Sequence, residues 1–140
     1  MNPGPDLHLD LDLPAGPLRR STGAVLTVRL TNRGSAPVLI NRRMSPGYLD
    51  SISREIYFDL DTHYGRRKYD RDLPSPSDYG PLDAGETISA GIDLLAWYRN
   101  TEPGTYRLTC HYQADEPAAD PPDGVAQGVV SSEPVDVTVV

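Results

Sequence analysis

The sequence predicts an all-β domain of the immunoglobulin-like kind, a two-sheet antiparallel sandwich of seven to eight strands with a long irregular middle segment. Apolar and polar residues alternate with period two in several segments, as they do in half-buried strands. The 14 prolines and 12 glycines are spread along the chain, where they would interrupt helices but suit the turns between short strands. With 140 residues, we expect one domain over residues 1–140.

The alternation places most strands directly. It predicts five strands, at Leu7–Leu13, Leu26–Thr31, Ile88–Leu94, Tyr106–Tyr112 and Val135–Val139. Shorter candidates lie at Val38–Asn41 and Glu55–Asp61, with a weak one at Lys68–Leu73. Residues that favour tight turns separate these runs, at Pro14–Pro17, Asn32–Pro37, Asp83–Gly85, Glu102–Gly104 and Pro121–Gly124. Only Leu94–Asn100 indicates a helical turn.

The charge of the chain argues against nucleic acid as a partner. The formal net charge is -7 and the pI is about 4.8, whereas a phosphate backbone must be met by a net positive surface. The charge is uneven, because residues 19–72 hold eleven bases and six acids. This asymmetry suits either an acidic partner or a mixed solvated surface.

Cys110 is the only cysteine, so no internal disulfide can form, which favours a reducing compartment. The first residues show neither a basic start nor an apolar stretch, and no apolar run approaches the roughly 20 residues that cross a bilayer. We therefore expect a cytoplasmic protein without a signal peptide or membrane contact, although a processed secreted form would look the same.

Several strand and turn motifs carry a family resemblance. They are Asn32-Arg33-Gly34 before Pro37-Val38, Leu82-Asp83-Ala84-Gly85-Glu86, Ile92-Asp93-Leu94, Tyr98 and Gly104-Thr105-Tyr106-Arg107-Leu108. With them the chain resembles immunoglobulin-like accessory domains, and is similar to the N-terminal domain that accompanies deuterolysin-type (aspzincin) metallopeptidases. The His-Glu-x-x-His motif of their catalytic domain does not occur here. The resemblance therefore implies a module without catalytic residues.

Tyr106 follows Gly104 at the start of a late strand and resembles the tyrosine corner of these sandwiches, which implies a structural hydrogen bond. Cys110 and His111 are adjacent, but neighbouring side chains of a strand point to opposite faces. We therefore interpret Cys110 as a buried apolar residue and not as a nucleophile.

The sequence offers no strong metal or cofactor site. The histidines, His8, His63 and His111, lie in separate segments, so we expect no cofactor. Aspartates at two-residue spacing are most simply a solvated strand face. A calcium ion would need six to eight oxygens, and its weak candidate ligands are Asp59, Asp61, Asp70 and Asp72.

The irregular segment from Arg42 to Glu86 is the best candidate for a functional surface. It combines arginine and tyrosine, the residues that most often carry binding energy at protein interfaces. The candidate partner-binding residues are Arg42, Arg43, Tyr48, Tyr64, Arg66, Arg67, Lys68, Tyr69 and Tyr79. Loop tyrosines that cover the core would give the same pattern.

Two classes of function stay open at this point. The first is a non-enzymatic protein-binding or scaffold module that uses these loops or an edge strand, including self-association through that edge. The second is a small enzyme, a ligand carrier or a calcium-binding domain whose site forms only in three dimensions. Its residues would gather around Asp59, His63, Asp70 and Tyr79.

Overall fold

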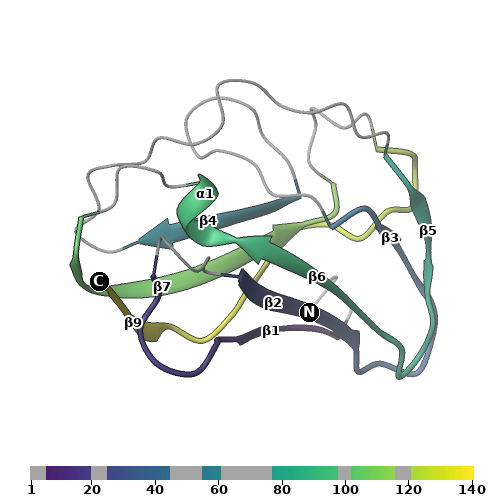
Figure 1. Ribbon diagram of the computed structural model, residues 1–140. Helices are drawn as coiled ribbons and strands as arrows, with labels where there is room; N and C mark the ends of the chain where they lie inside the picture. The colour runs from purple at the N-terminus through teal and green to yellow at the C-terminus, as the bar shows by residue number, and fades with distance from the viewer. Residues whose placement is uncertain (1–5, 20–24, 45–54, 61–76, 98–101, 116–120) are drawn as a thin grey trace.

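The computed structural model describes residues 6–19, 25–44, 55–60, 77–97, 102–115 and 121–140, and these form an all-β domain (Figure 1). In that part of the chain lie the strands β1 Leu7–Asp12, β2 Val25–Asn32, β3 Val38–Asn41, β4 Ile56–Leu60, β5 Tyr79–Leu82, β6 Thr87–Asp93, β7 Gly104–Gln113, β8 Val129–Ser131 and β9 Val135–Val139. One helical turn, α1 Leu94–Trp97, follows β6. The predicted strand at Lys68–Leu73 lies outside the described residues.

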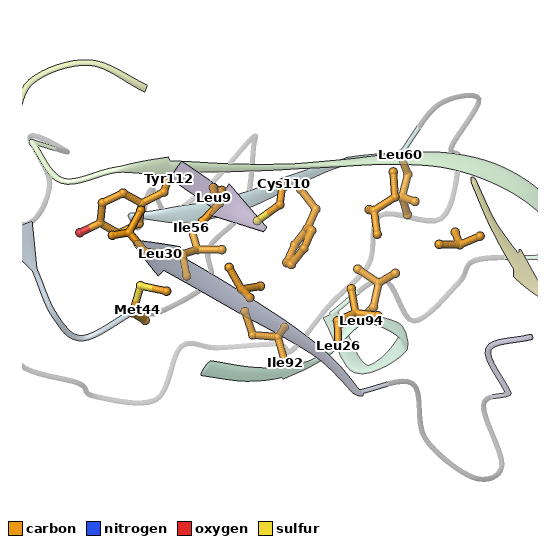
Figure 2. Close-up of a cluster of buried hydrophobic side chains, with 14 of the residues drawn as sticks. Leu9, Leu26, Leu30, Met44, Ile56, Leu60, Ile92, Leu94, Cys110 and Tyr112 are labelled. Carbon is orange, nitrogen blue, oxygen red and sulfur yellow. The ribbon is translucent and has the colours of Figure 1, made fainter. Parts of the chain in front are cut away.

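The strands pair antiparallel in three sheets. One sheet has the order β1-β2-β6, and the other large sheet has the order β4-β7-β8, with β9 also paired to β7. The pair β3-β5 forms a small third sheet at one end of the molecule (Figure 1). The side chains of the two large sheets meet in one core (Figure 2), which confirms the predicted immunoglobulin-like sandwich.

The central strands β2 and β7 supply the middle of the core. On β2, Leu26, Val28 and Leu30 are completely buried, while the residues between them are only half-buried. On β7, Leu108 and Cys110 are likewise completely buried. This alternation is the one that the sequence shows, because each inward residue of a strand is followed by an outward one.

Two strands were not predicted from the sequence. The sequence places the residues of β5 in the irregular segment, because Gly80 and Pro81 both argue against a strand interior. The structure corrects this: β5 pairs with β3 alone among the described strands, and proline is tolerated at an edge. Strand β8 has only three residues, too few to show an alternation.

The helical turn α1 begins within the predicted Leu94–Asn100 segment. Its residues Leu94 and Leu95 are buried in the core, and Figure 2 shows Leu94 near Leu26 of β2. Among the residues that the structure describes, no helix has the length and apolar character needed to cross a membrane.

The core predicts a clear contrast between two substitutions on β2. We expect Leu30→Ala to lower the free energy of unfolding by about 2–5 kcal/mol, because it leaves a cavity at a completely buried site. The control is Val25→Thr at the start of the same strand, where the side chain is 55% exposed, with an expected change of about 0.5 kcal/mol or less. Urea unfolding followed by circular dichroism measures both, and equal losses would contradict this assignment of the core.

Candidate functional site

A cluster of polar groups lies at the end of the sandwich where the long irregular segments are attached. We call it the polar stem and define it as Asn41, Arg43, Glu55, Tyr112 and the backbone of Asp78. Both ends of segment 45–54, and the C-terminal end of segment 61–76, join the described chain at the polar stem. The Gln113 amide of β7 donates to the Glu55 carbonyl over 2.7 Å, which fixes the start of β4 beside the end of β7.

Tyr112 joins the stem to the core. Its hydroxyl donates to the carbonyl oxygen of Asn41 over 2.8 Å and accepts from the amide of the same residue over 3.2 Å. Figure 2 shows the hydroxyl at the margin of the apolar cluster. Burial, together with the nearby carboxylate of Glu55, raises the pKa of the phenol. Tyr112 therefore stays protonated and holds the end of β3 as a donor.

Arg43 and Glu55 close the base of segment 45–54. The guanidinium donates two hydrogen bonds to the carboxylate, from Nε to Oε2 over 2.9 Å and from Nη2 to Oε1 over 2.7 Å. The Arg43 side chain is 11% exposed and that of Glu55 is not exposed. This is a forked, largely desolvated pair, the geometry in which such contacts are strongest.

The side chain of Asn41 links the remaining parts of the stem. Its Oδ1 accepts from the amides of Arg43 over 3.3 Å and Asp78 over 3.0 Å. Its Nδ2 is buried and makes no hydrogen bond with any part of the chain that the structure describes. An unpaired buried donor costs about 1–3 kcal/mol. Met44, three residues further along the chain, is buried and has a φ of 53°, in the left-handed region that non-glycine residues rarely adopt. The stem therefore holds its shape at some cost in stability.

Arg42 makes a second, more exposed network. It donates to the Glu86 carboxylate over 3.0 Å and to the Pro81 carbonyl over 2.7 Å, while Glu86 also accepts from the Asp83 amide over 2.9 Å. The hydrogen bond from Arg42, and then the one from Asp83, lower the pKa of Glu86. The same contact raises the pKa of Arg42. This network fastens the end of β3 to the turn between β5 and β6.

Three of the candidate partner-binding residues are described, and the structure brings them to one end of the sandwich. Arg42 and Arg43 bind carboxylates of their own chain, and Tyr79 is half-buried against the core. The other six candidates, Tyr48, Tyr64, Arg66, Arg67, Lys68 and Tyr69, lie outside the described residues. Binding of a partner by these nine residues stays a prediction.

The candidate calcium ligands and the alternative enzyme site are only partly described. Asp59 is exposed on the outer face of β4, while Asp61, Asp70, Asp72 and His63 lie outside the described residues. Within the described ranges, no three histidine, cysteine or acidic side chains are grouped to hold a metal ion. His8 contacts Asp10 over 2.7 Å.

Cys110 and His111 point to opposite faces of β7. Burial raises the pKa of the Cys110 thiol, which keeps it protonated. His111 lies on the outer face, stacks on Tyr57 at 4.8 Å between ring centroids, and contacts the Ser131 hydroxyl over 2.7 Å. Partial burial lowers the pKa of His111, against an opposing effect of Asp59. The thiol and the imidazole are therefore separated by the sheet.

Tyr106 makes a hydrogen bond back along the chain. Its hydroxyl donates to the carbonyl oxygen of Glu102 over 2.6 Å, four residues upstream. The partly buried ring also packs against the hydrophobic core. This is the geometry of a tyrosine corner, in which the hydroxyl fixes the chain before the strand begins.

Sequence reasoning did not select three residues of the polar stem. Asn41 and Glu55 were placed only as strand residues, and Tyr112 only as an inward residue of β7. One signal was present: Arg43 and Glu55 lie on either side of a segment that joins two predicted strands. Opposite charges at the two ends of one connection suit an ion pair that closes it.

The sheet order and the corner at Tyr106 define the class of protein, an immunoglobulin-like β-sandwich domain. A scan against models of known families gives no match, and a search of curated proteins finds no relative. Among solved structures, the chain is similar to the CARDB domain of the PF1109 protein from Pyrococcus furiosus, a crystal structure described as a complex with di-metal ions. The identity is 15% and the TM-score 0.44, over 100% of this chain and 97% of that one. None of these comparisons points to the deuterolysin accessory domain.

We expect substitutions of the adjacent residues Arg42 and Arg43 to cause different losses of stability. Arg43→Met removes both charged hydrogen bonds that Glu55 accepts from Arg43 at a desolvated position, so we expect a loss of about 3–5 kcal/mol. Arg42→Met breaks a pair whose side chains are about a third exposed, and should cost about 1 kcal/mol or less. Urea unfolding of both variants measures the contrast, and a larger loss for Arg42→Met would refute it.

The lowered pKa of Glu86 predicts that the stability of the fold depends on pH. Folding lowers this pKa. The ion pair therefore contributes fully to the free energy of unfolding when the pH is above the pKa of Glu86 in the unfolded chain, and this contribution is lost as the pH falls through the pKa of Glu86 in the folded chain. Glu86→Gln should therefore be less stable than the parent at neutral pH, and the difference should shrink on acidification. The same substitution in the Arg42→Met background is the control, since its effect should vary less with pH. Parallel pH profiles in the two backgrounds would contradict the pairing.

Proposed function

We propose that this chain is a non-enzymatic protein-binding or scaffold module, and that segments 45–54 and 61–76 contact the partner. The observation that carries this proposal is the polar stem, which ties both ends of the first segment and the returning end of the second to the sandwich. A fixed base reduces the entropy that a loop loses on binding, and so favours recognition.

The energetics of the stem support this proposal. A buried ion pair rarely stabilises a fold more than apolar side chains of similar volume would. The unpaired Nδ2 of Asn41 and the left-handed backbone of Met44 add to the cost. Local costs of this kind concentrate at functional positions, where a defined shape matters more than stability.

The composition of the two segments supports it as well. They contain Tyr48, Tyr64, Arg66, Arg67, Lys68 and Tyr69, in a chain whose overall charge is negative. Tyrosine and arginine give large contacts for little loss of side-chain freedom. The basic run at residues 66–68 would attract an acidic surface on the partner.

The alternative enzyme or ligand site needs Asp59 and Tyr79 to converge, but these residues belong to different sheets. Ile56 begins β4 beside the polar stem. Asp59 is three residues further along the strand, and therefore roughly 10 Å from that end of the sandwich.

We also propose that the chain is related to the accessory domains of deuterolysin-type metallopeptidases, a resemblance that agrees with a non-catalytic role.

Charge reversal in the second segment tests this function. We expect Arg66→Glu/Arg67→Glu/Lys68→Glu to lose the proteins that co-purify with the tagged parent chain, because an acidic partner surface would then be repelled. Quantitative affinity purification from native cells measures the loss, and circular dichroism shows that the variant is folded.

The matched control reverses three exposed arginines elsewhere, Arg19, Arg33 and Arg107, each to glutamate. It changes the net charge by the same amount and should retain the partners. If the two triple variants recover the same proteins in equal amounts, binding through residues 66–68 is wrong.

A further inference from the structure

The outer face of the sheet β4-β7-β8 carries a row of three functional side chains from three neighbouring strands. Tyr57 of β4 is opposite His111 of β7, and His111 is opposite Ser131 of β8. Cys110 lies in the apolar cluster (Figure 2), so His111, the next residue of the strand, projects from the other face. Side chains that are directly opposite on one face are close enough to interact.

Ser131 and His111 form a short hydrogen bond. The distance from the serine Oγ to Nδ1 of the imidazole is 2.7 Å. When the imidazole proton is on Nε2, Nδ1 carries a lone pair and accepts this bond from the hydroxyl. Partial burial lowers the pKa of His111, which favours the neutral imidazole at neutral pH. His111 is therefore placed to take the hydroxyl proton of Ser131.

Two residues of β4 act on the imidazole from the side opposite Ser131. The ring of Tyr57 stacks on that of His111, with 4.8 Å between the centroids and 29° between the planes, which limits the orientation of the imidazole. The carboxylate of Asp59 favours the charged imidazolium, against the effect of burial. An imidazolium is the form that results when the imidazole takes a proton from a serine. Asp59 therefore stabilises the product of that proton transfer.

The two adjacent serines at the end of β8 have different environments. Ser132 is buried, and its Oγ accepts from the amide of Cys110 over 2.9 Å, which fastens the chain after β8 to β7. Ser131 is exposed, and its hydroxyl faces the imidazole and not the backbone. A reagent can therefore reach Ser131, whereas Ser132 serves the fold.

We propose that Ser131 is a nucleophile that accepts an acyl group from an activated ester, such as an aryl ester, with His111 as its general base. Oγ bonds to the carbonyl carbon while Nδ1 takes the hydroxyl proton. The bond from that carbon to the leaving oxygen then breaks, and the imidazolium returns the proton to this oxygen. The products are an acylated Ser131 and a free alcohol or phenol. The site lies outside segments 45–54 and 61–76, so it is independent of the proposed function.

Acetylation of the parent chain by p-nitrophenyl acetate at neutral pH tests the nucleophile. Proteolysis followed by tandem mass spectrometry locates the acetyl group and measures the rate at each serine. Ser89 is the internal control, because it is also exposed on the outer face of a strand but is opposite Arg29, which is not a base. General-base catalysis contributes about 10²–10⁴-fold, so we expect Ser131 to react at least about 100-fold faster than Ser89.

Substitution of the histidine tests the general base. His111→Asn keeps a polar side chain beside Ser131 but cannot take a proton at neutral pH, so the rate at Ser131 should fall to that at Ser89. The matched control is His8→Asn, which removes a half-buried histidine from the outer face of the other large sheet and should leave the rate at Ser131 unchanged. Circular dichroism shows whether both variants are folded. If His111→Asn does not fold, the comparison of Ser131 with Ser89 in the parent chain still decides.

Three results would overturn the proposal: a rate at Ser131 no higher than that at Ser89, an unchanged rate at Ser131 in folded His111→Asn, or an acetyl group that is found on His111 and never on Ser131. The variant with charge reversal at residues 66–68 should be acetylated at Ser131 like the parent chain. That outcome separates this test from the test of partner binding, since the same variant is expected to lose its partners.

Discussion

The structure depends on burial of the inward faces of β2 and β7, the two strands with neighbours on both sides. Every second residue of β2 from Leu26 to Leu30 is completely buried, and so is every second residue of β7 from Leu108 to Tyr112. No disulfide supplements this core, since Cys110 is the only cysteine and acts as one of its apolar residues. All other strands are positioned by pairing with these two or by packing on them.

The chemistry of the core changes at the end of β7. The side chains of Leu108 and Cys110 belong to the apolar core. The hydroxyl of Tyr112, by contrast, is hydrogen-bonded to the backbone of Asn41, and the ion pair of Glu55 with Arg43 lies at the same end of the sandwich. Desolvated polar groups tolerate few alternative arrangements, because each must keep its partner. The sandwich is thus held by non-directional burial in its middle and by directional bonds below the long segments. This difference makes that end suitable for presenting a surface of defined shape.

The sequence predicts the regular part of the fold well, and the reason is physical. Alternation reports which face of a strand is buried, so Leu7–Leu13, Leu26–Thr31 and Val135–Val139 could be located within a few residues. The strand β5 was missed because Gly80 and Pro81 are compatible with a strand only at an edge, and edges are set by topology. The polar stem was missed for a similar reason: Asn41 and Tyr112 meet across 71 positions of sequence, which no local pattern records.

The edge strands of the sandwich are under a constraint that the central strands do not have. A strand in the middle of a sheet has its backbone groups paired on both sides, so side-chain packing is the main constraint on its sequence. An edge strand must also be protected from other chains, and β5 and β1 show such protection in Pro81 and in the charged side chains of β1.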